Sequence, residues 1–280
     1  MEIGVMMFPT DKSIQPVPLA IEAEQRGFES IWFPEHSHIP SSRETPWGGR
    51  EGAPPLPEEY WRSHDQFVAL AAVAGATKTI KLATGITLVA QRDPLWLSKE
   101  VASLDMISGG RFIFGIGYGW NKEEMRNHGL AYGERRAILR ENILACKAIW
   151  GADEFTFEGQ HVKYEPSWSW PKPTQQPHPP ILMGAFPGPK TLADIVEYCD
   201  GWMPIHGRYD ILKDLEKVKQ AWADGGRDPE AFKWGVFALP PDPEVIAAYA
   251  EAGADYAAFG IPSNGPDDVL PRLDKMADLL

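Results

Sequence analysis

Short apolar runs alternate with longer amphipathic stretches along the whole chain. The intervening stretches carry apolar residues at helical spacing, as in the segment that contains Phe67, Leu70 and Ala74. This alternation predicts parallel strands joined by helices. Eight such units in 280 residues predict an α/β fold, a single (β/α)8 TIM barrel over residues 1–280, rather than an open doubly wound sheet. The predicted strands lie at residues 3–8, 30–33, 80–85, 111–116, 181–184, 201–204, 234–238 and 256–260.

Proline and glycine mark several of the predicted helix ends. Pro16 and Pro94 are suited to the first helical position, and Gly27 is a candidate C-cap. Two segments interrupt the regular pattern, so we expect insertions there. The first is the insert PSSRETPWGGREGAPPLPEEYW after the second strand, ahead of a helix that begins near Ser63. The second, at 151–180 after the helix over 133–150, contains EFTFEGQHVKYE, which predicts a hairpin. Further helices are expected over 188–198 and 208–224 and from Pro243.

Charge and cysteine content narrow the class of protein. A net charge of −12 argues against a nucleic-acid or anionic-membrane surface, because both need clustered Lys and Arg. Cys146 and Cys199 are far apart in the chain and form no disulfide framework or metal motif. The start, MEIGVMMFPT, lacks the basic segment of a signal peptide and is too short to span a membrane. We therefore expect a soluble cytoplasmic protein.

The second predicted strand ends in a polar group that a purely structural strand does not need. Ile31-Trp32-Phe33 stops at Pro34, and Glu35 and His36 follow at once. In barrels of this type the active site lies at the carboxyl ends of the strands. A histidine there exchanges a proton near neutral pH, and an adjacent carboxylate can tune it. The pattern thus favours His36 and Glu35 as acid–base residues, and the alternative is a polar loop that packs against the insert.

Three further strand ends are rich in glycine. Gly85 interrupts a β-branched run, which is typical of a bulge, of a close ligand approach or of a simple kink. Gly117 and Gly119 follow the fourth strand with a spacing that differs from the Rossmann fingerprint. Gly184-Ala185-Phe186 leads into a helix near Lys190, where free amides and the helix dipole suit a phosphate, although a plain turn has the same pattern.

These segments together resemble the luciferase-like monooxygenase superfamily, and within it the branch that uses the deazaflavin coenzyme F420. The resemblance covers nearly the whole chain. It is most specific in LDMISGGRFIFGIGYGWNKEE and extends to GFESIWFPEH, ATGITLVAQRDPLWLSKEVAS, ILMGAFPGPKTLADIVEYCDGW and EVIAAYAEAGADYAAFGIP.

The resemblance implies a flavin or deazaflavin ring across the mouth of the barrel. It places a non-proline cis peptide at Gly85-Ile86, where the backbone would press against the ring and bend it. It also implies that His36 is an acid or base, with Glu35 in a place where Asp is common. The family's sugar-phosphate dehydrogenases carry a Glu where this chain has Gly119 or Trp120, which argues against that activity. The implied cofactor-binding residues are Gly85, Ile86, Thr87, Gly117, Tyr118, Gly119, Trp120 and Asn121, with Gly184, Ala185 and Phe186 at the phosphate.

Two redox functions follow from the resemblance. The first is hydride transfer between coenzyme F420 and a small organic substrate. The second is an FMN-dependent monooxygenase that uses oxygen and reduced flavin from a partner reductase. F420 carries an anionic oligoglutamate tail, so an acidic protein needs local cations for it, and FMN needs fewer. Candidates are Arg43, Arg50, Arg62 and Lys190. We expect a homodimer and a substrate pocket lined by both inserts through Trp47, Tyr60, Trp61, Trp168 and Trp170. These aromatic residues favour an apolar or planar substrate, and packing of a loose lid explains them equally well.

Two other classes remain as alternatives. His36-Ser37-His38 is an H-x-H pair, and barrel hydrolases use such pairs to bind one metal. His206 is the only residue at a later strand end that would support this hypothesis, so no metal site is predicted. The other alternative is a non-catalytic barrel that has lost its cofactor, although nothing at the strand ends indicates degeneration.

Overall fold

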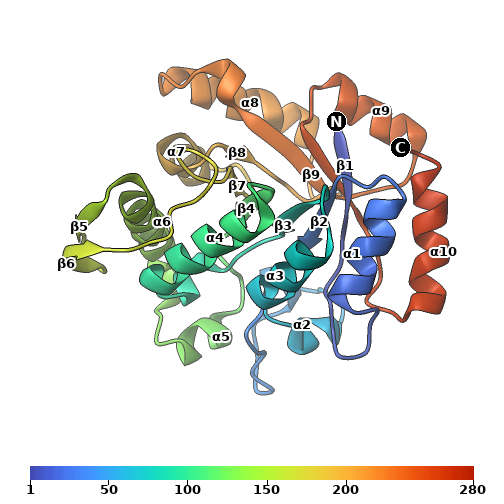
Figure 1. Ribbon diagram of the computed structural model, residues 1–280, viewed down its shortest axis with the longest axis horizontal. Coiled ribbons are helices and arrows are strands. Elements are labelled where there is room, and N and C mark those ends of the chain that lie inside the picture. The colour runs from blue at the N-terminus through green and yellow to red at the C-terminus, as the bar shows by residue number, and fades with distance from the viewer.

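Eight parallel strands close into a barrel in the order β1-β10-β9-β8-β7-β4-β3-β2 (Figure 1). β1 pairs with both β10 and β2, which closes the ring. The computed structural model describes all 280 residues and confirms the predicted TIM barrel. The strands are β1 Glu2–Met6, β2 Ser30–Phe33, β3 Lys81–Thr84, β4 Phe112–Ile116, β7 Ile181–Met183, β8 Gly201–Trp202, β9 Lys233–Leu239 and β10 Tyr256–Gly260.

Helices surround the barrel, and the two chain termini lie near each other (Figure 1). Proline starts α1, α4, α7, α9 and α10, because its fixed φ fits the first helical turn and its missing amide is not needed there. No helix combines the length and the apolar character that crossing a bilayer requires. The main helices are α1 Pro16–Gln25, α3 Gln66–Ala76, α4 Pro94–Ser108, α6 Arg135–Gly151, α7 Pro189–Tyr198, α8 Ile211–Asp224, α9 Pro243–Glu251 and α10 Pro266–Ala277.

The strands are apolar on both faces because each face packs against protein. In β2, Ile31 and Phe33 join the large cluster of 55 buried residues, whereas Trp32 belongs to a separate cluster of eight. Side chains alternate along a strand, so this smaller cluster fills the barrel interior. The Trp32 ring meets Phe237 edge-on, with centroids 5.1 Å apart.

Several boundaries differ from the predicted ones because side chains cap the helices. The helix expected near Ser63 begins at Gln66, where the Asp65 carboxylate accepts a hydrogen bond from the Val68 amide. The helix expected over 208–224 begins at Ile211, where Asp210 caps it. Helix α5, Lys122–Asn127, was not predicted at all.

The two insertions have different positions. The first carries the short η1 Trp47–Gly49 and α2 Glu59–Arg62 and lies at the mouth of the barrel. The second contains the predicted hairpin, with β5 Glu154–Glu158 antiparallel to β6 Lys163–Trp168. Its turn is held on α6, because the Glu141 carboxylate accepts the amides of residues 160–162. Only the first insertion therefore reaches the strand ends.

Candidate active site

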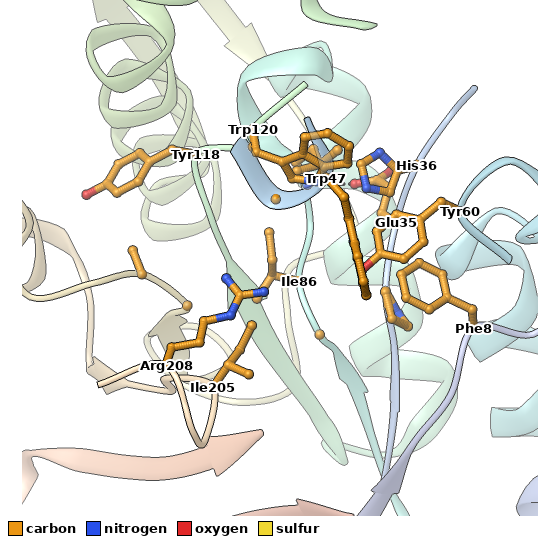
Figure 2. Close-up of a pocket in the computed structure, with 17 residues that line it drawn as sticks. Phe8, Glu35, His36, Trp47, Tyr60, Ile86, Tyr118, Trp120, Ile205 and Arg208 are labelled. Atoms are coloured by element: carbon orange, nitrogen blue, oxygen red, sulfur yellow. Dashed lines mark hydrogen bonds between the residues drawn. The ribbon is translucent and has the colours of Figure 1, made fainter. Parts of the chain in front are cut away.

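A cavity of about 240 Å³ opens at the carboxyl ends of the barrel strands (Figure 2). Two adjoining cavities of about 270 and 290 Å³ share Gly48 and Arg208 with it, so the three form one extended hollow. Its position and size are those of a ligand site in a TIM barrel. The first cavity is lined by Phe8, Pro34, Glu35, His36, Trp47, Gly48, Tyr60, Gly85, Ile86, Leu88, Tyr118, Gly119, Trp120, Gly184, Ala185, Ile205 and Arg208.

Ile86 forms part of the cavity wall, and two glycines from neighbouring loops pack closely against its side chain. The Gly85–Ile86 peptide bond is cis, as predicted. A Cβ atom at Gly117 would lie 2.5 Å from Ile86 Cδ1, and one at Gly184 would lie 2.6 Å from Ile86 Cγ2. Only glycine lets the loops after β4 and β7 approach Ile86 this closely.

His36 is held in place by a carboxylate from another strand end. Its Nδ1 lies 2.7 Å from Oε2 of Glu124, which has no solvent-exposed side-chain surface. The Ser37 amide donates to the other carboxylate oxygen at 3.1 Å. The carboxylate favours the tautomer with hydrogen on Nδ1, which leaves the Nε2 lone pair available to a ligand in the cavity. The arrangement can accept a proton at Nε2 and stabilise the resulting imidazolium.

Helix α5 positions Glu124, a residue that was not predicted from the sequence. The Asn121 side chain accepts hydrogen bonds from the amides of Glu123 and Glu124 and so starts the helix. Glu123 in turn accepts the amides of Glu44 and Thr45, which ties the first insertion to α5. Asn followed by two acidic residues is a helix-start signal that could have revealed α5.

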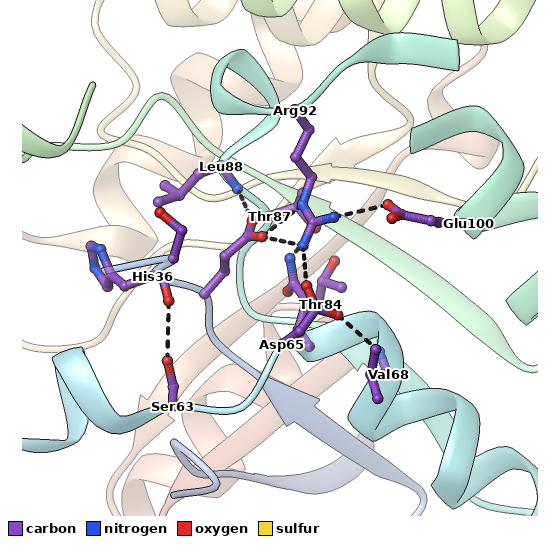
Figure 3. A network of polar contacts seen from close by, with 12 residues as sticks. His36, Ser63, Asp65, Val68, Thr84, Thr87, Leu88, Arg92 and Glu100 are labelled. Carbon is purple, nitrogen blue, oxygen red and sulfur yellow. Dashed lines mark hydrogen bonds and ion pairs between the residues drawn. The ribbon is translucent and has the colours of Figure 1, made fainter. Parts of the chain in front are cut away.

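Glu35 also lines the cavity, but both its oxygens are engaged. Oε2 accepts the Leu88 amide at 2.7 Å, and Oε1 accepts Arg92 Nε at 2.6 Å. Figure 3 shows Arg92 extending further to Asp65 and Glu100. Burial opposes the charge of Arg92, but the surrounding carboxylates, Glu35 foremost, raise the pKa of its guanidinium. This geometry favours a role for Glu35 in fixing the loop after β3.

The predicted cofactor residues fall into three groups. Thr87, Gly117 and Asn121 do not line the cavity, and Thr87 is instead hydrogen-bonded to the Gln66 amide nitrogen at 3.0 Å. Phe186 lines the adjoining cavity, with its ring edge-on to Tyr209. The residues that line the first cavity are Gly85, Ile86, Tyr118, Gly119, Trp120, Gly184 and Ala185.

Tyr118 contributes its ring rather than its hydroxyl. The hydroxyl donates to Asp194 at 2.5 Å, and the Arg136 guanidinium lies 3.8 Å from the ring centroid. Figure 2 shows the phenol turned away from His36. Burial, with the Asp194 carboxylate, raises the pKa of this tyrosine well above its usual range. Tyr118 therefore anchors the glycine-rich loop after β4.

Aromatic rings surround His36. The centroid of its ring is 5.2 Å from that of Tyr60 and 5.6 Å from that of Trp120. Trp47 packs edge-on against Tyr60 at 5.8 Å, and Phe8 lies on the other side of Tyr60 at 4.5 Å. These rings keep the imidazole almost fully buried, so ligand chemistry at Nε2 would proceed away from bulk water.

The prediction for the pocket-lining aromatic residues is confirmed in part. Trp47 and Tyr60 line the cavity, as expected. Trp61, Trp168 and Trp170 do not, and about half or more of the surface of each is exposed, with Trp168 at 77%. The expectation that residues 151–180 line the pocket was wrong, because that hairpin is held against α6.

Arg208 lines all three cavities of the hollow. It was not among the cations predicted from the sequence. It follows β8 and makes no hydrogen bond or ion pair within the protein, and neither does the Arg50 side chain in the adjoining cavities. Arg62 is instead paired with Asp11 and Glu58. The position of Arg208 beyond a strand end is the sequence signal that was available.

The H-x-H pair does not converge on one point. His36 contacts Glu124, whereas His38 contacts Ser37 Oγ at 2.9 Å and Asn127 at 2.9 Å. His206 lies beside the hydroxyl of Tyr249 at 3.0 Å. The ligand set of the metal-hydrolase hypothesis is therefore not assembled.

Comparison with known proteins places these features in a family. The model of the luciferase-like monooxygenase family matches residues 15–260. An uncharacterised protein of Mycobacterium tuberculosis is 37% identical over 99% of this chain and 98% of its own length. The FMNH2-dependent dimethylsulfone monooxygenase of Pseudomonas putida is 31% identical over 63% of this chain and 48% of its own length.

A solved structure shares the fold. The F420-dependent secondary alcohol dehydrogenase in complex with an F420-acetone adduct superposes with a TM-score of 0.78 at 19% identity, covering 100% of this chain and 98% of that one. The proteins compared thus include one described as F420-dependent, which shares the fold, and one described as FMNH2-dependent, which is related in sequence. With the family model matched over most of the barrel, this chain belongs to the luciferase-like monooxygenase family.

Proposed function

We propose that the protein is an oxidoreductase that transfers a hydride between coenzyme F420 and a small organic substrate. One observation carries the proposal: a histidine held by a buried carboxylate, with Nε2 free, lies in the cavity that Ile86 and Arg208 line. Such a histidine–carboxylate pair can transfer a proton to or from a substrate that lies beside a redox ring. The secondary alcohol dehydrogenase with the same fold is F420-dependent.

The residues of the hollow fit a deazaflavin. Ile86 and the rings of Tyr118 and Trp120 offer an apolar surface to a planar heterocycle. The segment before α7 offers the Ala185 amide and the positive end of a ten-residue helix to a phosphate, whereas the Gly184 amide donates to the Ile116 carbonyl. Arg50 and Arg208 are cations without a protein partner, which suits an anionic side chain. These local positive charges would allow a protein with a net charge of −12 to bind the anionic tail of F420.

When bound, the deazaflavin would supply or accept a hydride, and because it lacks N5 it reacts poorly with oxygen. The chain's own residues would handle the accompanying proton. Nε2 of His36 would give a proton to, or take one from, the substrate oxygen, and Glu124 would stabilise the charged ring. The surrounding aromatic rings would exclude water, and the small volume of the first cavity favours a small substrate.

The second candidate is an FMN-dependent monooxygenase that receives reduced flavin from a partner reductase. The dimethylsulfone monooxygenase among the relatives supports it. The two unpaired arginines favour F420, because one phosphate needs less positive charge than an oligoglutamate tail.

Titration of the purified protein with each cofactor tests the proposal. We expect F420 to bind with higher affinity than FMN and the protein to oxidise or reduce a small alcohol or carbonyl compound with it. His36→Ala should keep the affinity for F420 within a few-fold and lose turnover. Tight FMN binding with no response to F420 would overturn the proposal in favour of the monooxygenase.

A further inference from the structure

Glu124 has a second set of neighbours on the side away from His36. Ser37 Oγ lies 2.9 Å from Nδ1 of His38, 2.7 Å from Nε2 of His128 and 3.5 Å from Oε1 of Glu124. His38, Glu124 and His128 each contribute one potential ligand atom, and these three atoms lie within 4.8 Å of one another. Two imidazoles and a carboxylate thus surround a single point outside the candidate active site.

We propose that His38, Glu124 and His128 form a binding site for a divalent cation of the zinc class. Two histidines and one carboxylate are the protein ligands of many zinc sites with an open fourth position. Imidazole nitrogen suits Zn²⁺ and Co²⁺ rather than Mg²⁺ or Ca²⁺, which prefer oxygen ligands. The Ser37 hydroxyl or a water molecule would complete the coordination.

The spacing of the ligand atoms is compatible with a small contraction around a metal. Metal–nitrogen bonds of about 2.0–2.1 Å in a tetrahedron place neighbouring ligand atoms roughly 3.4 Å apart. Because no two ligand atoms lie more than 4.8 Å apart, each pair would approach by at most about 1.4 Å. His128 is exposed and His38 is half-buried, so both rings have room to move, while the buried Glu124 remains fixed.

The neighbouring residues support the ligands in the way that metal sites require. Glu124 and His128 are four residues apart, at α5 and its C-cap, and so lie on the same side of this helix. Asn127 contacts Nε2 of His38 at 2.9 Å. A half-turn of the Asn127 amide would present its oxygen to an Nε2 proton and leave Nδ1 as the metal ligand.

The site also has its own access. His128 lines a separate cavity of about 580 Å³, which shares no lining residue with the active-site cavity. A cation could therefore enter while the active-site cavity is filled. Glu124 is the one side chain that would contact both the cation and His36.

Metal titration of the full-length, metal-stripped protein tests the site. Calorimetry with zinc sulfate, followed by dialysis and metal analysis, should give one tightly bound Zn²⁺ per chain. His38→Ala and His128→Ala should each weaken binding at least about tenfold, and Asn127→Ala about tenfold. His64→Ala, which removes a half-buried histidine paired with Gln15 elsewhere, should leave Zn²⁺ binding unchanged. Far-UV circular dichroism and thermal melting check that each variant is folded.

Cobalt provides a second readout that does not depend on activity. Co²⁺ at this site should give the intense visible absorption of a tetrahedral complex, and His128→Ala should abolish it. Absence of stoichiometric Zn²⁺ binding, or binding that is unchanged in both histidine variants, would overturn the site. An inactive protein that binds Zn²⁺ as expected would contradict the proposed function alone.

Discussion

Nδ1 of His36 and Oε2 of Glu124 lie 2.7 Å apart, although 88 residues separate them in the chain. The barrel makes this contact possible, because both residues follow carboxyl ends of strands that converge at one rim. The carboxylate is fully buried, so its charge acts on the imidazole with little screening. His36 and Glu124 therefore form one acid–base unit.

Removal of either member of this unit should impair proton transfer. His36→Ala is expected to lower turnover at least about tenfold, a small general acid–base contribution. Glu124→Gln keeps the shape of the side chain and removes the charge, so kcat should also fall about tenfold with a smaller change in KM. Steady-state kinetics with F420 measures both. Glu134→Gln is the matched control, since Glu134 is exposed and its side chain makes no hydrogen bond or ion pair within the protein. Unchanged kcat in both site variants would remove the unit from the mechanism.

The glycines behind Ile86 should be intolerant of a methyl group. Gly184→Ala places a carbon 2.6 Å from Ile86 Cγ2, so Ile86 must shift toward the cavity that it lines. We expect cofactor affinity to fall at least several-fold while the fold persists. A titration followed by the cofactor's absorbance measures this. Gly75→Ala is the control, because nothing lies within 4 Å of a Cβ atom there in α3. That control should raise the melting temperature by the usual helical preference of Ala over Gly.

The parts of the molecule that follow from local sequence pattern were predictable. The barrel was evident from eight apolar runs, and the proline starts of α1 and α4 were read at the correct residues. Helix α5 was missed because it is short and follows a glycine-rich loop, so its periodicity is too brief to detect. Glu124, which lies in this helix, was therefore not predicted as a site residue.

Tertiary placement explains the remaining differences. Asn121 was assigned to the cofactor through the family resemblance, yet its side chain caps α5. The proposed role of Arg208 depends on its lacking an acidic partner. Arg62 was predicted as a cofactor-binding cation, although the fold pairs it with acidic residues. Pairing across the fold is invisible in a single sequence.

The arginines at the exit of the hollow should distinguish the two cofactors. Arg208→Gln and Arg50→Gln should each weaken F420 binding, and the loss should shrink as salt is added, because exposed charges are screened. FMN binding should change less, since it carries a single phosphate. Arg62→Gln is the control, as Arg62 is paired with Asp11 and Glu58. Equal losses for F420 and FMN would place the arginines at a phosphate that both cofactors share.

Stability in acid should depend on Glu24, far from the cavity. Burial alone would raise the pKa of Glu24, but the amides of Ile80, Thr79 and Lys78 outweigh it and lower the pKa from 4.5 to about 2. A carboxyl with a depressed folded-state pKa stabilises the fold above its unfolded pKa, and this contribution disappears as the pH falls through the folded value. The contacts tie α1 to the segment that enters β3.

Glu24→Gln should therefore lower the free energy of unfolding by about 1–2 kcal/mol near neutral pH, where the partial exposure of the site reduces the full effect. The difference from wild type should narrow as the pH falls from about 4.5 toward 2, because the wild-type carboxylate becomes protonated over that range. Urea unfolding curves at a series of pH values measure this difference. Glu29→Gln, at an exposed side chain that makes no hydrogen bond or ion pair, should follow wild type at every pH. A constant difference between wild type and Glu24→Gln down to the lowest pH would show that the amide contacts, and not the charge, stabilise this junction.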